Sequence, residues 1–179
     1  YSEGGYATTT SIYTGMDIFP TGSELQNVTK GTMEAWVGVA AACYIAAGSY
    51  LDQANGNAYS YVQFISDPSK LAVRVWAWET FSGTARYPYC RIQLYINGGL
   101  IGEVGLSMYT FYHVYMVWDA TGGLSGGRTV RVFVNGSEYL SSTVVPNGLS
   151  SAQKYIEMYG WGSVITNWWT GAYTMANQY

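Results

Sequence analysis

The segment Tyr112–Tyr139 constrains the fold more than any other part of the sequence, because two apolar-rich runs flank a glycine-rich stretch there. Apolar side chains alternate with others along His113–Trp118 and again along Thr129–Val134. Alternation with a period of two on both sides of a turn is typical of two strands joined by that turn. The pair Asn135-Gly136 favours a second tight turn, because both residues tolerate positive φ. The segment therefore predicts antiparallel strands with a core face that includes Val130, Val132 and Val134.

Similar short strands are predicted along the rest of the chain. They are expected at Tyr6–Tyr13, Thr32–Val39, Cys43–Ala47, Tyr59–Ile65, Leu71–Glu79, Arg91–Ile96, Tyr155–Tyr159 and Asn167–Met175. Turn residues separate the runs, and this spacing is typical of a β-sandwich or jelly roll. No stretch has the composition of a linker. We therefore expect one all-β domain over residues 1–179, in which residues 1–31 form an N-terminal strand segment that could add to the sheet of another copy.

The composition excludes some functions. Charged residues make up 11% of the chain, compared with about a quarter in typical soluble domains. The eight Lys and Arg residues are scattered, which argues against a nucleic-acid partner. The uncharged run Ala35–Leu51 is diluted by glycine and is shorter than the roughly 20 apolar residues of a membrane helix, so no membrane span is expected. So little charge suits a protein that works outside the cell or buries much of its surface against partners.

Two cysteines and two glycosylation sequons bear on location. Cys43 and Cys90 could form a disulfide, as in extracellular proteins, or could be two buried free thiols. Asn27 and Asn135 begin N-x-S/T sequons, which also suit a secreted protein. Two cysteines and one histidine do not supply an ordinary structural zinc site, so no metal is expected.

Three segments, taken in order, resemble the laminin-G-like domains of the concanavalin-A-like lectin/glucanase superfamily. They are Thr32–Val37 (TMEAWV), Tyr59–Trp76 (YSYVQFISDPSKLAVRVW) and Tyr112–Ser137, with a weaker match at Trp169–Met175. The resemblance implies a jelly roll of two antiparallel sheets. Some members of the family bind calcium through Asp and carbonyl oxygens, but the aspartates of this chain form no dense cluster of such ligands, and no cofactor is expected.

Enzymatic chemistry has little support in the sequence. Glucanases of the superfamily use paired carboxylates, whereas the glutamates here are isolated, and Glu34 with Glu157 is the first pair to consider across strands. The single histidine, His113, is six residues from Asp119, which places the two about 20 Å apart on a straight strand. We therefore expect His113 to pack locally and the protein not to be an enzyme.

The outward-facing residues of the predicted strands are the candidate binding residues. They combine aromatic rings with arginines, and the set consists of Trp36, Arg74, Trp76, Trp78, Tyr95, Tyr115, Arg131 and Phe133. Such a mixture suits stacking on sugar rings, an interface between proteins, or aromatic packing under loops of the same chain.

The sequence favours a non-catalytic surface subunit, extracellular or on a virion. It would assemble with copies of itself into a filament, coat or appendage, or act in adhesion. A carbohydrate-binding, lectin-like module that recognises surface glycans is the alternative, and a glycoside-active enzyme is a remote third.

Overall fold

The computed structural model describes the backbone of residues 2–3, 6–8, 15–18, 29–38, 57–64, 68–82, 85–107, 110–149, 156–159 and 164–171. Side chains are described for residues 29–38, 62–64, 68–77, 89–107, 110–149 and 156. The strands in this part of the chain are β1 (Ser2–Glu3), β2 (Tyr6–Thr8), β3 (Gly15–Ile18), β4 (Lys30–Gly38), β5 (Asn57–Phe64), β6 (Leu71–Ser82), β7 (Ala85–Ile96), β8 (Gly99–Leu106), β9 (Phe111–Asp119), β10 (Val130–Val134), β11 (Ser137–Ser142), β12 (Ile156–Tyr159) and β13 (Val164–Gly171). One short 3-10 turn, η2, spans Ser125–Gly127.

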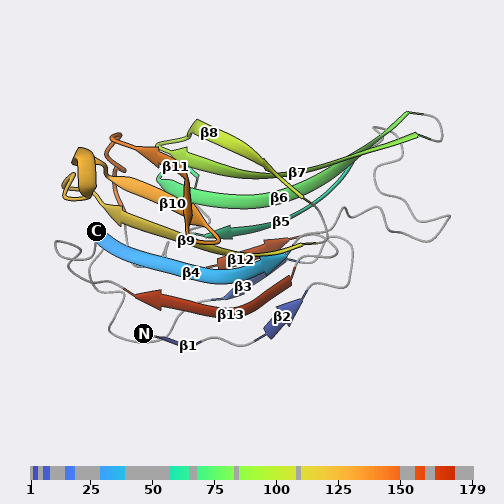
Figure 1. Ribbon diagram of the computed structural model, residues 1–179, viewed down its shortest axis with the longest axis horizontal. Coiled ribbons are helices and arrows are strands. Elements are labelled where there is room, and N and C mark those ends of the chain that lie inside the picture. The colour runs from blue at the N-terminus through green and yellow to red at the C-terminus, as the bar shows by residue number, and fades with distance from the viewer. Residues whose placement is uncertain are drawn as a thin grey trace.

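The strands form a jelly-roll sandwich of two antiparallel sheets (Figure 1). Sheet A has the order β1-β13-β4-β9-β10-β11, with β2 also paired to β13. Sheet B has the order β3-β12-β5-β6-β7-β8. Both sheets therefore begin on one side with strands from the N-terminal part of the chain and end on the other side with β11 and β8. No helix in the described residues is long and apolar enough to cross a membrane.

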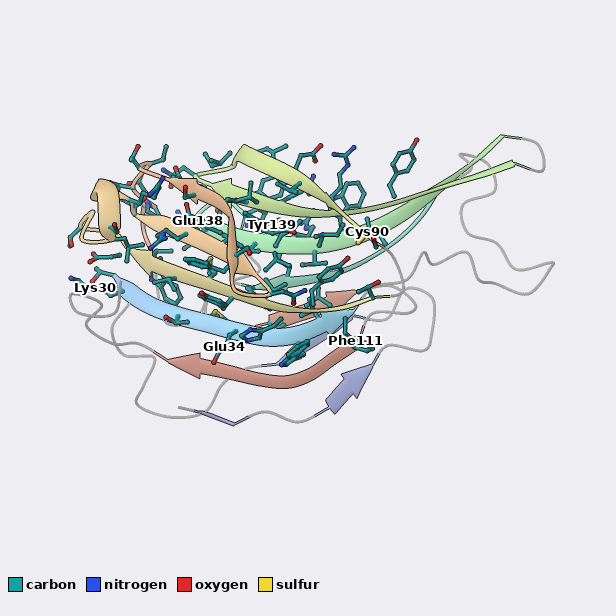
Figure 2. All side chains as sticks on the ribbon, in the orientation of Figure 1. Lys30, Glu34, Cys90, Phe111, Glu138 and Tyr139 are labelled. Carbon is teal, nitrogen blue, oxygen red and sulfur yellow. The ribbon has the colours of Figure 1, made fainter. Side chains whose placement is uncertain are left out.

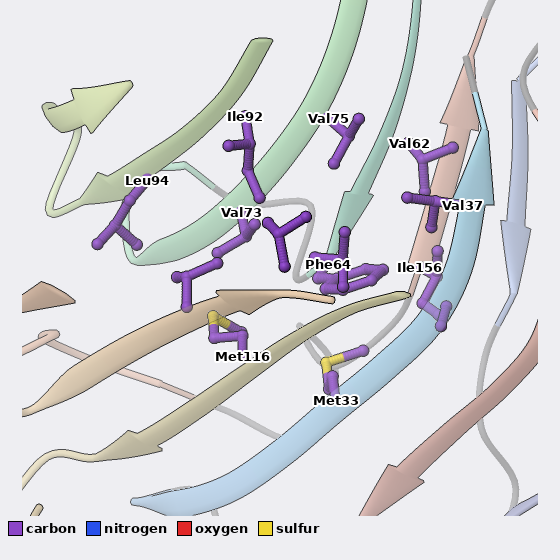
Figure 3. Close-up of a cluster of buried hydrophobic side chains, with 14 of the residues drawn as sticks. Met33, Val37, Val62, Phe64, Val73, Val75, Ile92, Leu94, Met116 and Ile156 are labelled. Carbon is purple, nitrogen blue, oxygen red and sulfur yellow. The ribbon is translucent and has the colours of Figure 1, made fainter. Parts of the chain in front are cut away.

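The core lies between the inner faces of the two sheets and follows the alternation seen in the sequence. In sheet A, the inward-facing side chains of β9 are Val114, Met116 and Trp118. Their partners on β10 are Val134, Val132 and Val130, and none of the six is more than 2% exposed. Residues of sheet B such as Phe64, Val73 and Leu94 pack against them in the same buried cluster (Figure 3). Burial of such side chains stabilises each by about 1.5–3 kcal/mol relative to exposure. The period of two therefore fixes which side chains can face outward.

Two Asn-Gly turns close neighbouring strand pairs. Asn97 and Gly98 between β7 and β8 have φ of 53° and 81°, and Asn135 and Gly136 between β10 and β11 have φ of 49° and 84°. Positive φ at both central residues is the requirement of a type I′ hairpin turn, whose twist matches that of the strands. The turn predicted from Asn135-Gly136 is confirmed.

The prediction of an all-β, two-sheet antiparallel sandwich is confirmed, while several strand boundaries differ. Strands β6 and β7 both extend beyond the predicted Leu71–Glu79 and Arg91–Ile96, and together they form a hairpin that projects to the right in Figure 1. Strands β8 and β11 were not predicted. Strand β8 contains three glycines and β11 is mostly polar, so neither has the composition typical of a strand. The predicted strand Cys43–Ala47 lies outside the described residues.

The N-terminal segment supplies edge strands within its own chain. Strand β2, the start of the predicted Tyr6–Tyr13, pairs with β13 through Ala7 opposite Ile165. Strand β1 also pairs with β13, where Ser2 lies opposite Thr170. Strand β3 pairs with β12 in sheet B. Addition of this segment to a neighbouring copy stays a prediction.

A matched pair of leucines tests the core. Leu94 is fully buried and Leu100 is 49% exposed, so the same truncation should have very different effects. We expect Leu94→Ala to lower the free energy of unfolding by about 2–5 kcal/mol and Leu100→Ala to change it by no more than about 0.5 kcal/mol. Urea unfolding of both variants measures the difference. Equal losses would contradict the placement of the core.

Candidate functional site

The candidate binding residues do not form one face. Trp36, Tyr115, Arg131 and Phe133 lie on sheet A, whereas Arg74, Trp76, Trp78 and Tyr95 lie on sheet B. Because both sheets turn their apolar residues toward the shared core, these two groups lie on opposite outer surfaces of the sandwich. Sequence alternation predicted correctly that the residues alternate with core positions, but it could not assign strands to sheets. The side chain of Trp78 is outside the described residues.

On the outer surface of sheet A, aromatic rings form a ladder across β4, β9 and β10. Trp36 stacks on His113 with ring centroids 5.3 Å apart, and Tyr115 stacks on Phe133 at 4.5 Å with an interplanar angle of 7°. His113 and Tyr115 join the two pairs at 5.7 Å. The register explains this order, because Trp36 lies opposite His113 and Phe133 lies opposite Tyr115. Stacked pairs of this kind contribute about 0.5–1.5 kcal/mol beyond burial.

Polar contacts fix the orientation of His113 in the ladder. Its Nε2 lies 3.2 Å from Oε2 of Glu34 on the neighbouring strand. Its backbone N–H donates to Oδ1 of Asn135 at 2.9 Å, and the Asn135 N–H donates to the His113 carbonyl oxygen at 2.8 Å. The prediction that His113 packs locally agrees with these contacts. Neither Glu34 nor Asn135 could be linked to His113 from the sequence, since both links cross strands.

An arginine covers the other end of the ladder. The guanidinium carbon of Arg131 lies 4.8 Å from the Phe133 ring centroid, and its Nε donates to Glu138 at 2.7 Å. Burial raises the pKa of Glu138, but hydrogen bonds from Arg131 and Ser141 and the nearby charges of Arg131 and Arg128 outweigh it and leave that pKa lowered. The carboxylate is therefore charged at neutral pH and holds Arg131 in place.

The glycine-rich connection between β9 and β10 folds back over sheet A. Leu124 packs with Val117 and Tyr115 in a small cluster outside the main core, which buries Val117 although it lies on the outer side of the sheet. Asp119 anchors the connection: it is 2% exposed, pairs with Lys30 at 2.9 Å and accepts hydrogen bonds from Thr121. Trp36 and Phe111, at the opposite end of this surface, are exposed instead.

On the outer surface of sheet B, polar residues form a row in register across four strands. Gln63 lies opposite Arg74, Arg74 opposite Gln93, and Gln93 opposite Glu103. Arg74 donates to Gln63 at 2.7 Å, and Glu103 accepts from Gln93 and from Arg91, each at 2.8 Å. Tyr95 donates to Gln93 at 3.0 Å. Because these groups hydrogen-bond one another, Gln63 and Gln93 remain almost fully buried without an unfavourable desolvation.

A third feature, the apolar edge, lies where β8 and β11 end their sheets. It consists of five apolar side chains that are each between 38% and 49% exposed: Leu100, Ile101, Tyr139, Val144 and Val145. The segment after β11 is held to both sheets, since Thr129 Oγ1 donates to the Val144 carbonyl at 2.5 Å and Asn97 Nδ2 donates to the Val145 carbonyl at 2.9 Å. Leu140 of β11 also packs over Gly102 of β8. The edge is therefore a fixed surface built from both sheets, and no sequence pattern pointed to it.

The remaining predicted site residues are not brought together. The Cys43–Cys90 disulfide stays a prediction: the buried Cys90 has no partner among the described cysteines, and Cys43 lies outside the described residues, as does Asn27. Asn135 is exposed in its turn. Glu34 lies in sheet A and Glu157 in sheet B, so the pair of carboxylates considered from the sequence is separated by the sandwich. Among the described side chains, no group of three or more His, Cys, Asp or Glu residues could hold a metal ion.

Comparisons with known proteins give only distant structural similarity. No family model matches the chain, and no curated protein matches it. A crystal structure of Caenorhabditis elegans galectin LEC-6 is similar, with a TM-score of 0.43 and 13% identity over 93% of this chain and 96% of that chain. A mutant of alginate lyase Aly36B in complex with alginate trisaccharide has a TM-score of 0.41 and 12% identity over 94% of this chain and 80% of that chain. At such values neither identifies a function, and the laminin-G-like resemblance stays a prediction.

The anchor of the β9–β10 connection gives a pH prediction. Burial raises the pKa of Asp119, but hydrogen bonds from Thr121 and Lys30 and the Lys30 charge leave it lowered. A lowered folded-state pKa adds stability above the ordinary carboxyl pKa of about 3.9, and this stability is lost as pH falls through the folded pKa. We expect Asp119→Asn to be less stable at neutral pH and to lose less stability on acidification. An unchanged acid dependence of the urea midpoint would contradict this role.

Cysteine labelling tests the state of Cys90. Burial raises the pKa of its thiol to about 12, so the reactive thiolate is scarce at neutral pH. In a Cys43→Ser variant, Cys90 should not react with a thiol reagent at neutral pH until the protein is unfolded. Fast labelling of the native variant would show that Cys90 is accessible. Intact-mass measurement of the wild-type chain, which detects a disulfide as a loss of two hydrogens, tests the Cys43–Cys90 bond directly.

Proposed function

We propose that this chain is a non-catalytic structural or adhesive subunit that assembles with copies of itself through the apolar edge, as an extracellular or virion surface protein. The apolar edge is the observation that carries the proposal. Leu100, Val144 and Val145 are each more than 40% exposed, and all belong to one fixed surface. Several exposed apolar side chains at one edge of a sandwich are typical of a surface that a partner covers.

The backbone of the edge supports the same function. Edge strands of proteins that stay monomeric are commonly protected by lysine, proline or extreme shortness. Strand β8 has eight residues without lysine or proline and a single charge at Glu103, and β11 has a single charge at Glu138. Among the described strands, β7 is the only sheet partner of β8 and β10 is the only one of β11. Both therefore offer hydrogen-bonding groups to a strand of another copy.

The arrangement of edges favours an open assembly. Strands β1, β2 and β3 lie on the side of the sandwich opposite to β8 and β11 (Figure 1). If the N-terminal side of one copy meets the apolar edge of the next, the two contacting surfaces differ. Such head-to-tail contacts repeat without closing unless their rotation forms a ring, so they generate filaments. The low content of charged residues, 11%, reduces repulsion between stacked copies.

Charge insertion at the edge tests the proposal. Leu100→Asp should prevent assembly, since a carboxylate would be buried against the neighbouring copy without a partner. Phe111→Asp is the matched control, because Phe111 is 48% exposed and lies on sheet A away from the apolar edge (Figure 2). Light scattering coupled to size-exclusion chromatography, with electron microscopy of the peak fractions, measures the assembly. Circular dichroism verifies the fold of both variants.

The expected result is that wild type and Phe111→Asp form larger species as concentration rises while Leu100→Asp stays monomeric. Wild-type protein that is monomeric at every concentration would refute the proposal. Assembly of Leu100→Asp equal to that of wild type would also refute the role of the apolar edge.

A further inference from the structure

We propose that the exposed end of the aromatic ladder, at Trp36, is a binding site for an uncharged sugar. This site is separate from the apolar edge, and its function does not depend on assembly. It comprises Trp36, Glu34 and His113, with Phe111 beside them on the same surface.

The first observation is an exposed flat ring on a rigid support. Trp36 is 40% exposed although it lies in the middle of sheet A, and its ring stacks on His113. Phe111 is 48% exposed and packs over Gly38, where a Cβ atom would lie 3.0 Å from the ring. Because the register places Gly38 opposite Phe111 and Trp36 opposite His113, two exposed rings flank the histidine. Aromatic surfaces of this kind stack on the apolar face of a sugar ring.

The second observation is a pair of hydrogen-bonding groups beside the rings. Glu34 and His113 interact at 3.2 Å, and their side chains are 30% and 26% exposed. Both therefore reach solvent at the base of the exposed Trp36 ring. A carboxylate accepts hydrogen bonds from two hydroxyls, and the imidazole can accept or donate one. A few oriented polar groups next to apolar surface are the usual composition of a small-ligand site.

The same pair decides between a sugar and a second protein copy. A dry protein interface over Trp36 would bury the Glu34–His113 pair. The free-energy cost of removing such polar groups from water can exceed the gain from their mutual attraction. Sugar hydroxyls instead replace the water that these groups lose. The carboxylate also disfavours anionic sugars, because Lys30 and Arg131, two cations of this surface, are already paired with Asp119 and Glu138. An uncharged pyranose with equatorial hydroxyls presents the flat C–H face that Trp36 can cover.

The test uses a panel of neutral, β-linked oligosaccharides of glucose and galactose, measured by titration calorimetry and ligand-observed NMR. Wild type should bind at least one member, and Trp36→Ala should weaken that binding by about tenfold or more. Glu34→Gln keeps the shape of the side chain and should weaken binding by a similar factor, through loss of charge-assisted hydrogen bonds. Tyr89→Ala is the matched control, because Tyr89 is 39% exposed on β7 of sheet B and belongs neither to the Trp36 site nor to the apolar edge. Its binding should equal that of wild type.

Failure of this site is distinguishable from failure of assembly. In the Leu100→Asp background the sugar should still bind, since the two surfaces are separate. The proposal is overturned if no member of the panel binds wild type, if Trp36→Ala and Glu34→Gln both bind as wild type does, or if Tyr89→Ala loses binding to the same extent.

Discussion

Apolar packing between the two sheets is the constraint on which the rest of this structure depends. Each strand that contributes to the core must turn every second side chain inward, because side chains alternate across a strand. The remaining side chains are then fixed on one of two outer surfaces, with the spacing that strand pairing imposes. The aromatic ladder of sheet A and the polar row of sheet B are both consequences of this packing. Neither is built from a loop, so both are held by the core.

The outer surfaces and the edge differ in what they can bind. The polar row on sheet B is internally satisfied, since Glu103 and Gln63 already accept hydrogen bonds from their neighbours. At Trp36, by contrast, ring surface remains exposed beside a polar pair that reaches solvent. The apolar edge has exposed aliphatic side chains on strands whose outer backbone groups can pair. Sugar recognition and self-assembly thus fit different parts of the molecule and could operate in the same protein.

Sequence reasoning predicted features that depend on neighbours along the chain. The alternation in His113–Trp118 and the Asn135-Gly136 dipeptide identified strands, their core face and a turn, because each is encoded within a few residues. It failed where contacts cross strands. Trp36 and Trp76 carry the same local pattern, yet they lie on different sheets, and only strand order decides this. The links from His113 to Glu34 and Asn135, and the apolar edge, likewise depend on register between segments far apart in sequence.

Hydrogen exchange tests the central claim, self-assembly through the apolar edge, most directly. Backbone amides of β8 that point away from β7 have no described sheet partner, so in the dilute protein they should exchange rapidly. Amides in the middle of β9, between β4 and β10, should be protected at all concentrations. The account predicts that β8 and β11 amides gain protection as concentration rises and copies assemble, while those of β9 do not change. Exchange of β8 and β11 that stays rapid in the assembled protein would contradict it.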